Sequence, residues 1–125
     1  IKELVTAVNR IRRENPALQE LDNLRFYDAD DDNVLFYGKM TPDGRNIILI
    51  AVNLDPFEPH ESLLEFPLAE MGIGAEDTFE VEELLSGARH LWRGALQRVR
   101  LEPEAPAAIF RIHRWTKVDY ESPCF

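Results

Sequence analysis

The chain has 125 residues, which is enough for one domain that buries roughly two-thirds of the surface exposed by its unfolded form. Hydrophobic residues make up 45% and charged residues 30%, so the composition argues against a disordered chain. The longest apolar run, residues 47–52, is far too short to span a membrane. The net charge of −9 argues against a nucleic-acid partner, because the phosphates would repel most of this surface.

The single cysteine and the start of the chain bear on the cellular setting. One cysteine, Cys124, excludes an internal disulfide and is compatible with a reducing compartment. No neighbouring sequence marks it as a nucleophile. The first residues are charged and amphipathic, so they do not resemble a signal peptide.

Apolar side chains at the start of the chain recur at helical spacing, on Ile1, Leu4, Val5, Val8 and Ile11. This stripe predicts an amphipathic helix. Asn15-Pro16 ends it, because a residue that precedes proline avoids the helical region. No capping residue precedes the first apolar positions, so we expect the beginning of this helix to be missing.

From residue 24 onward the pattern changes from helical to strand-like. Short strands are predicted at residues 24–27, 34–40, 46–53, 62–66, 78–85, 88–92, 97–101 and 107–114. A loop containing Gly72 and Gly74 separates the fourth strand from the fifth. About eight short strands at regular spacing predict a mainly β fold, an antiparallel β-sandwich preceded by one helix.

Three of these strands carry further information. The turn at residues 41–44 (TPDG) predicts a hairpin of the second and third strands, because proline presets φ and glycine tolerates positive φ. Residues 47–52 are apolar without alternation, so both faces of the third strand should be buried. In the fifth strand, Phe79 and Val81 alternate with glutamates, which predicts one buried face.

Metal sites are not favoured by the spacing of the acidic and histidine residues. The acidic run at residues 28–32 fails as a calcium loop, because Asn33 replaces the turn glycine and Lys39 replaces the bidentate glutamate. We expect a solvated turn there. No zinc-like paired spacing is found among the three histidines, His60, His90 and His113.

Carboxylates and aromatic rings are the remaining candidates for chemistry. Asp55 follows a strongly apolar strand, but its context favours a strand exit in which the carboxylate accepts backbone N–H bonds. Trp92 and Trp115 are the candidate carbohydrate-binding residues, because an aromatic face supplies rigid apolar area; core packing is the alternative. No catalytic residue, metal ligand or cofactor site is predicted.

Three motifs, in this order and spacing, carry a family resemblance. They are residues 9–18 (NRIRRENPAL), residues 50–56 (IAVNLDP), and residues 83–89 (ELLSGAR) with 92–94 (WRG). They resemble the C-terminal end of enzymes of the α-amylase superfamily, glycoside hydrolase family 13. Within it, the combination most resembles the family of α-1,4-glucan:maltose-1-phosphate maltosyltransferases, and the resemblance covers nearly the whole chain.

The resemblance implies a division of the chain and a role for it. Residues 1–18 would be the end of the last helix of a missing (β/α)₈ catalytic barrel, and residues 19–125 a C-terminal all-β domain. The catalytic Asp, Glu and third carboxylate of the family lie upstream and have no counterpart here. The implied role is a non-catalytic domain that stabilises the barrel of a cytoplasmic enzyme. That enzyme would transfer maltosyl units from maltose 1-phosphate to α-1,4-glucan without a cofactor.

Two alternatives stay open on the sequence alone. One is an autonomous carbohydrate-binding module for α-glucans, which needs aromatic side chains on one exposed face. The other is a domain for self-association, for which a homodimeric parent would be one case. Trehalose synthases and branching-type enzymes have comparable tails, so the residues that would identify the parent lie upstream.

Overall fold

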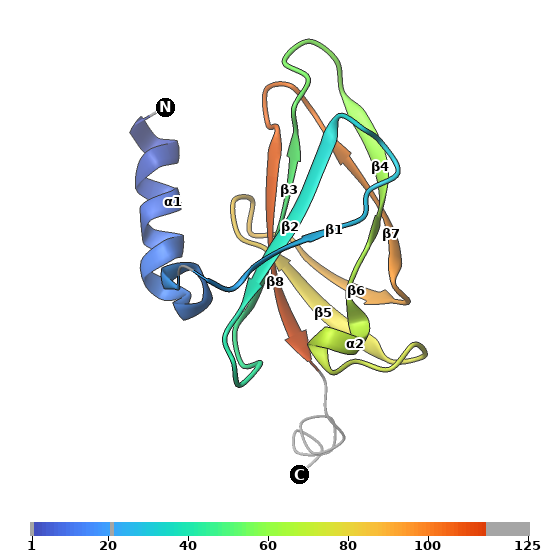
Figure 1. Cartoon of the computed structure of the whole chain (residues 1–125). Helices are drawn as coiled ribbons and strands as arrows, with labels where there is room; N and C mark the ends of the chain where they lie inside the picture. The colour runs from blue at the N-terminus through green and yellow to red at the C-terminus, as the bar shows by residue number, and fades with distance from the viewer. Residues whose placement is uncertain (1, 21, 115–125) are drawn as a thin grey trace.

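The structure, a computed structural model, describes residues 2–20 and 22–114 (Figure 1). Its helical segments are α1 (Lys2–Glu14), the 3-10 turn η1 (Pro16–Gln19) and α2 (Leu68–Met71). Its strands are β1 (Leu24–Tyr27), β2 (Val34–Met40), β3 (Ile47–Asn53), β4 (His60–Glu65), β5 (Thr78–Glu83), β6 (Arg89–Arg93), β7 (Leu96–Leu101) and β8 (Ala107–Arg114). The predicted helix stop and all eight predicted strands are confirmed.

The strands form two antiparallel sheets, which confirms the predicted β-sandwich. The larger sheet has the order β1-β2-β3-β8-β5-β6, and the smaller sheet pairs β4 with β7. β2 and β3 form the predicted hairpin. Figure 1 shows the small sheet on one side of the large sheet and α1 on the opposite side. We call that opposite side the helix side.

The main core lies between the two sheets and is rich in aromatic rings. The ring of Phe66, which follows β4, lies 5.1 Å from that of Phe36, 5.4 Å from that of Trp92 and 5.9 Å from that of Phe110. The two apolar positions of β5 are fully buried, as their alternation with glutamates predicted. This close packing fixes the two sheets against one another.

β3 is buried on both faces, as its continuous apolar run predicted. Leu49 belongs to the main core, whereas Ile48 packs on the helix side against Ile11 of α1, Ala17 of η1 and Ile109 of β8. Ile48 and Leu49 are both fully buried. The smaller core around Ile48 therefore fastens the C-terminal end of α1 to the large sheet.

Two short helical turns are absent from the sequence-based prediction. α2 lies in the segment predicted as a loop, where its Leu68 and Met71 are buried and Gly72 ends it at a left-handed φ of 73°. η1 begins at Pro16, which fits a first helical turn because its missing N–H needs no partner. Four residues are too few to show a helical period. None of the helices among the described residues is long and apolar enough to cross a membrane.

Candidate functional site: an apolar face on the helix side

Trp92, the predicted carbohydrate-binding residue of β6, is half-buried and points into the main core. Its ring meets those of Phe66 and Phe79 edge-on, and His90 stacks on it at 5.4 Å with an interplanar angle of 16°. Protein groups therefore cover much of the ring. Trp115 lies outside the described residues, and sugar binding by the two tryptophans stays a prediction.

The acidic run lies in the turn between β1 and β2, and it is more than a solvated turn. Asp30 Oδ1 accepts hydrogen bonds from Ser62 Oγ at 2.9 Å and from the backbone N–H of Leu63 at 2.8 Å. Asp31 contacts His60 of β4. Among the described residues, no three His, Cys, Asp or Glu side chains group as a metal site.

Asp55 also reaches His60, so one imidazole lies between two carboxylates. His60 Nδ1 lies 2.7 Å from Asp31 Oδ2, and His60 Nε2 lies 2.9 Å from Asp55 Oδ2. The other oxygen of Asp55 accepts the backbone N–H groups of Phe57 and Glu58 at 2.9 and 3.2 Å, which confirms the predicted strand exit. The meeting of both carboxylates at His60 was not predicted, because Asp31 and His60 are 29 positions apart in sequence.

These contacts shift the pKa of all three groups in the direction that favours their charged forms. Hydrogen bonds to Asp55 and then to Asp31 raise the pKa of His60 above its ordinary value. The backbone N–H of Asn33 and then His60 lower the pKa of Asp31. His60 and then the backbone N–H of Phe57 lower the pKa of Asp55. The cluster is therefore an ion triad, and all its polar atoms are committed to the fold.

The first motif of the family resemblance contains a buried amide that joins α1 to the hairpin. Asn15 Nδ2 donates to the carbonyl of Ile11 at 2.8 Å, and Asn46 Nδ2 donates to Asn15 Oδ1 at 3.0 Å. Asn46 Oδ1 then accepts the backbone N–H of Ala17 at 2.9 Å. Asn15 and Asn46 are 2% and 6% exposed. This pair fixes how α1 leaves the sandwich, because each amide satisfies groups that no water reaches.

The third motif contains a carboxylate, that of Glu83, which holds a turn in place. Glu83 accepts the backbone N–H groups of Leu85 at 3.1 Å, Ser86 at 2.7 Å and Ile109 at 2.8 Å. These bonds end β5 at Glu83, two residues before the predicted end of that strand. In the second motif, the Asn53 side chain donates to the carbonyls of Glu58 and Leu101 and accepts the N–H of Asp55. The motif residues thus have structural roles in this chain.

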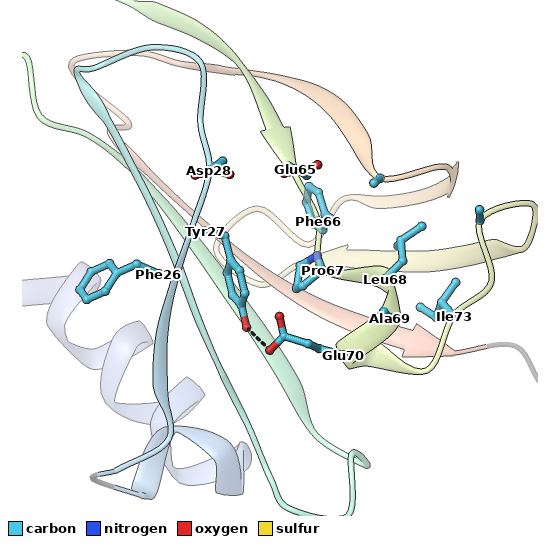
Figure 2. A pocket seen from close by; sticks show the side chains of 12 residues that line it. Phe26, Tyr27, Asp28, Glu65, Phe66, Pro67, Leu68, Ala69, Glu70 and Ile73 are labelled. Atoms are coloured by element: carbon cyan, nitrogen blue, oxygen red, sulfur yellow. Dashed lines mark hydrogen bonds between the residues drawn. The ribbon is translucent and has the colours of Figure 1, made fainter.

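A groove of about 520 Å³ lies between β1 and α2 (Figure 2). Its walls include Phe66, Pro67 and Leu68, and Figure 2 shows Tyr27 and Glu70 pointing toward one another across it. The Tyr27 hydroxyl donates to Glu70 Oε1 at 3.5 Å, and burial, followed by the Glu70 charge, raises the pKa of Tyr27 to about 12. The hydroxyl therefore stays protonated. Asp28 and Glu65 also line the groove.

The helix side of the molecule carries a set of exposed apolar side chains, which we call the apolar face: Val5, Val8, Leu24, Phe26 and Leu35. Val5 and Val8 of α1 are 53% and 42% exposed, although Ile11 on the same stripe is 3% exposed. On β1, Phe26 is 65% exposed, and its ring lies tilted against that of Tyr37, with ring centroids 6.1 Å apart. Figure 2 shows the side chains of Phe26 and Tyr27 on opposite sides of β1. Exposed apolar side chains gathered on one side of a domain are typical of an interaction site.

The opposite edge of the helix side is charged. On β5 and β6, Arg89 lies 2.9 Å from Glu80 and 3.6 Å from Glu82, and His113 of β8 lies 3.5 Å from Glu82. Arg89 is exposed, whereas Glu80, Glu82 and His113 are half-buried, and such surface pairs contribute little to stability. Leu91 of β6, which stands opposite Glu80, is also exposed on this edge.

In fold, this β-sandwich with its terminal helix matches parts of known carbohydrate-active enzymes. An α-amylase from Geobacillus thermoleovorans has a TM-score of 0.64 at 16% identity, covering 88% of this chain and 22% of that chain. An α-amylase from Anoxybacillus has a TM-score of 0.64 at 19% identity, covering 91% of this chain and 22% of that chain. At these identities the match shows the fold alone.

The sequence comparisons define the family. The family model described as GLGE, C-terminal matches residues 26–112, so the chain belongs to that family. It is 57% identical over 113 residues to the α-1,4-glucan:maltose-1-phosphate maltosyltransferase of Rhodospirillum rubrum, covering 90% of this chain and 16% of the relative. It is 44% identical over 119 residues to the enzyme of that name from Myxococcus xanthus, covering 95% of this chain and 18% of the relative. The chain therefore spans less than a fifth of these relatives, and the predicted resemblance is confirmed.

Proposed function

We propose that this chain acts as a non-catalytic C-terminal domain that docks on the catalytic barrel of a longer enzyme. In this proposal, residues 1–18 are the end of the last barrel helix, and residues 19–125 are the β domain. The family model begins at residue 26, after α1, which supports a boundary between α1 and the sandwich. The barrel would cover the apolar face.

The exposure gradient along α1 is the observation that carries this proposal. One apolar stripe runs from 3% exposure at Ile11 to 42% at Val8 and 53% at Val5. The sandwich covers only the end of the stripe, while Asn15 and Asn46 hold the exit of the helix in place. An amphipathic helix gains most of its stability from packing its apolar face. The uncovered part of α1 therefore needs a partner outside the sandwich.

The activity of the longer enzyme follows from the relatives. Because the relatives are named as α-1,4-glucan:maltose-1-phosphate maltosyltransferases, we propose maltosyl transfer from maltose 1-phosphate to α-1,4-glucan, in the cytoplasm. In this proposal the chemistry belongs to the barrel, and this chain contributes rigidity.

A hybrid enzyme tests this division of labour. The 113 matched residues of the Rhodospirillum rubrum relative would be replaced by the corresponding part of this chain. We expect the hybrid to release phosphate from maltose 1-phosphate with glucan present, and this chain alone to stay at the background without protein. The relative truncated before the matched region is the control, and it should lose activity or resistance to heat. Transfer by this chain alone, or a truncated relative as active and heat-resistant as the intact one, would overturn the proposal.

A further inference from the structure

We propose that His60 is a pH-dependent clamp, which ties two loops of the sandwich together while both of its ring nitrogens carry protons. His60 begins β4, Asp31 lies in the loop between β1 and β2, and Asp55 lies in the loop between β3 and β4. The three side chains are 17–24% exposed, so they are mostly shielded from solvent. The clamp thus joins the start of β4 to a loop of the large sheet and to the loop that connects the two sheets.

The protonation state follows from the contact geometry. An ionised carboxylate can only accept, so the nitrogens 2.7 and 2.9 Å from Asp31 and Asp55 must both donate. An imidazolium has two N–H groups and can satisfy both carboxylates, whereas a neutral imidazole has one. Deprotonation of His60 leaves a nitrogen lone pair facing a carboxylate oxygen. One of the two contacts must then open.

The other charged groups around His60 do not replace it. Leu101, which is apolar, stands opposite His60 on β7. The exposed Asp32 and Glu58, on the two loops, add only negative charge. The nearby charged side chains of β4, β7 and the first loop have partners of their own, in the pairs Glu61–Arg98, Arg100–Glu102 and Asp30–Ser62. The protonated imidazole is therefore the cation that holds Asp31 and Asp55 together.

What the clamp holds is the backbone of both loops. Asp31 Oδ1 accepts the N–H of Asn33 at 2.8 Å, and Asp55 Oδ1 accepts the N–H of Phe57 at 2.9 Å. Each carboxylate thus uses one oxygen for its own loop and the other for His60. Release of His60 leaves each loop with its local turn but removes the bond between the loops.

The direction of the pH dependence follows from the shifted groups. Because folding raises the pKa of His60, its contribution to stability is complete below the unfolded value, about 6.5. That contribution is lost as the pH rises through the raised, folded value. Folding lowers the pKa of Asp31 and Asp55, so their contribution is present above the unfolded value of 3.8 and is lost as the pH falls through their folded values. The clamp is closed between these limits and opens on the alkaline side.

Nitrogen NMR of this chain tests the clamp directly. We expect the titration midpoint of His60 to lie above about 6.5, and both ring nitrogens to show the chemical shifts of protonated imidazole on the acidic side of that midpoint. Asp31→Asn and Asp55→Asn should each lower that midpoint. Asp43→Asn, in the turn between β2 and β3, should leave it unchanged. A midpoint at or below the ordinary value in the unsubstituted chain would overturn the proposal.

Urea unfolding of His60→Gln provides a second readout. Glutamine keeps one donor and one acceptor but cannot take up a proton. We expect the stability gap between this variant and the unsubstituted chain to be largest below the unfolded histidine pKa and to close on the alkaline side. A gap that is equal at every pH would reduce His60 to a structural residue and overturn the clamp. If the variant does not fold, the NMR titration of the unsubstituted chain still tests the proposal.

Discussion

Buried polar side chains in this domain bond to backbone groups that are distant in sequence. Asn15 and Asn46 are 31 positions apart, and together they satisfy a carbonyl of α1 and an N–H of η1. Glu83 similarly reaches the N–H of Ile109, 26 positions away. Such residues stabilise the folded chain through these bonds, because an unpaired buried polar group is costly.

We predict that Asn15→Ala destabilises the chain by about 1–3 kcal/mol, because it removes the acceptor of the Asn46 Nδ2 group and the side-chain donor to the Ile11 carbonyl. Urea unfolding followed by tryptophan fluorescence would measure the change. Asn9→Ala, on the exposed surface of α1, is the matched control and should stay within about 0.5 kcal/mol. Equal losses in the two variants would contradict the role given to the Asn15–Asn46 pair.

Sequence reasoning at single residues succeeded where the cause was local. The bonds from Asp55 to the next N–H groups were predicted, because the strand exit and the carboxylate are neighbours in the chain. The pairing of His60 with Asp31 and Asp55 was not predicted, because it requires the register of two loops and a strand. For Trp92, core packing is the more common arrangement in a small β-sandwich and an exposed platform the less common one, and composition does not say which face of β6 points inward.

β2 shows how one strand position depends on its neighbours. Gly38 is buried in β2, opposite Leu49 on β3 and Arg25 on β1. A Cβ atom there would clash with Leu49 Cδ2, and it would lie 3.1 Å from both the Ile48 carbonyl oxygen and Tyr27 Cε2. A glycine in a strand interior often marks such a close approach.

We therefore predict that Gly38→Ala costs about 1–3 kcal/mol, the usual range for overpacking a core. Gly74→Ala is the control, since its Cβ would meet only the movable carboxylate of Asp77, and it should stay within about 0.5 kcal/mol. Thermal unfolding of both variants would measure the difference. If Gly38→Ala were as stable as the unsubstituted chain, the tight packing of β1, β2 and β3 would be wrong.

The strands were predictable because alternation and turn residues are local signals. Residues 78–83 alternate inward and outward, and residues 41–44 form a turn between paired strands, as expected. α2 was missed because a single helical turn is too short to show periodicity, and its two buried side chains depend on the core above them. The order of the strands in the large sheet could not be predicted from the sequence patterns either, because β5 and β8 pair although a long stretch of chain separates them.

Considered as a whole, the molecule has a closed core between its two sheets and exposed apolar side chains on its helix side. Aromatic side chains pack closely in the core between the sheets, whereas the side chains of the apolar face on α1, β1 and β2 are exposed. This asymmetry suits a domain that stands against a larger body. The family match and the short span of the relatives that it covers support the same conclusion.

The most direct test compares one double substitution, Val5→Glu with Val8→Glu, in two settings. In this chain alone both side chains are exposed, so we predict a change within about 0.5 kcal/mol per site by urea unfolding. In the hybrid with the Rhodospirillum rubrum enzyme, the same pair would place charges against the barrel, so we predict a lower thermal midpoint and a faster loss of transferase activity on heating. Equal effects in the two settings, or none in the hybrid, would contradict the claim that the apolar face of α1 docks on a catalytic barrel.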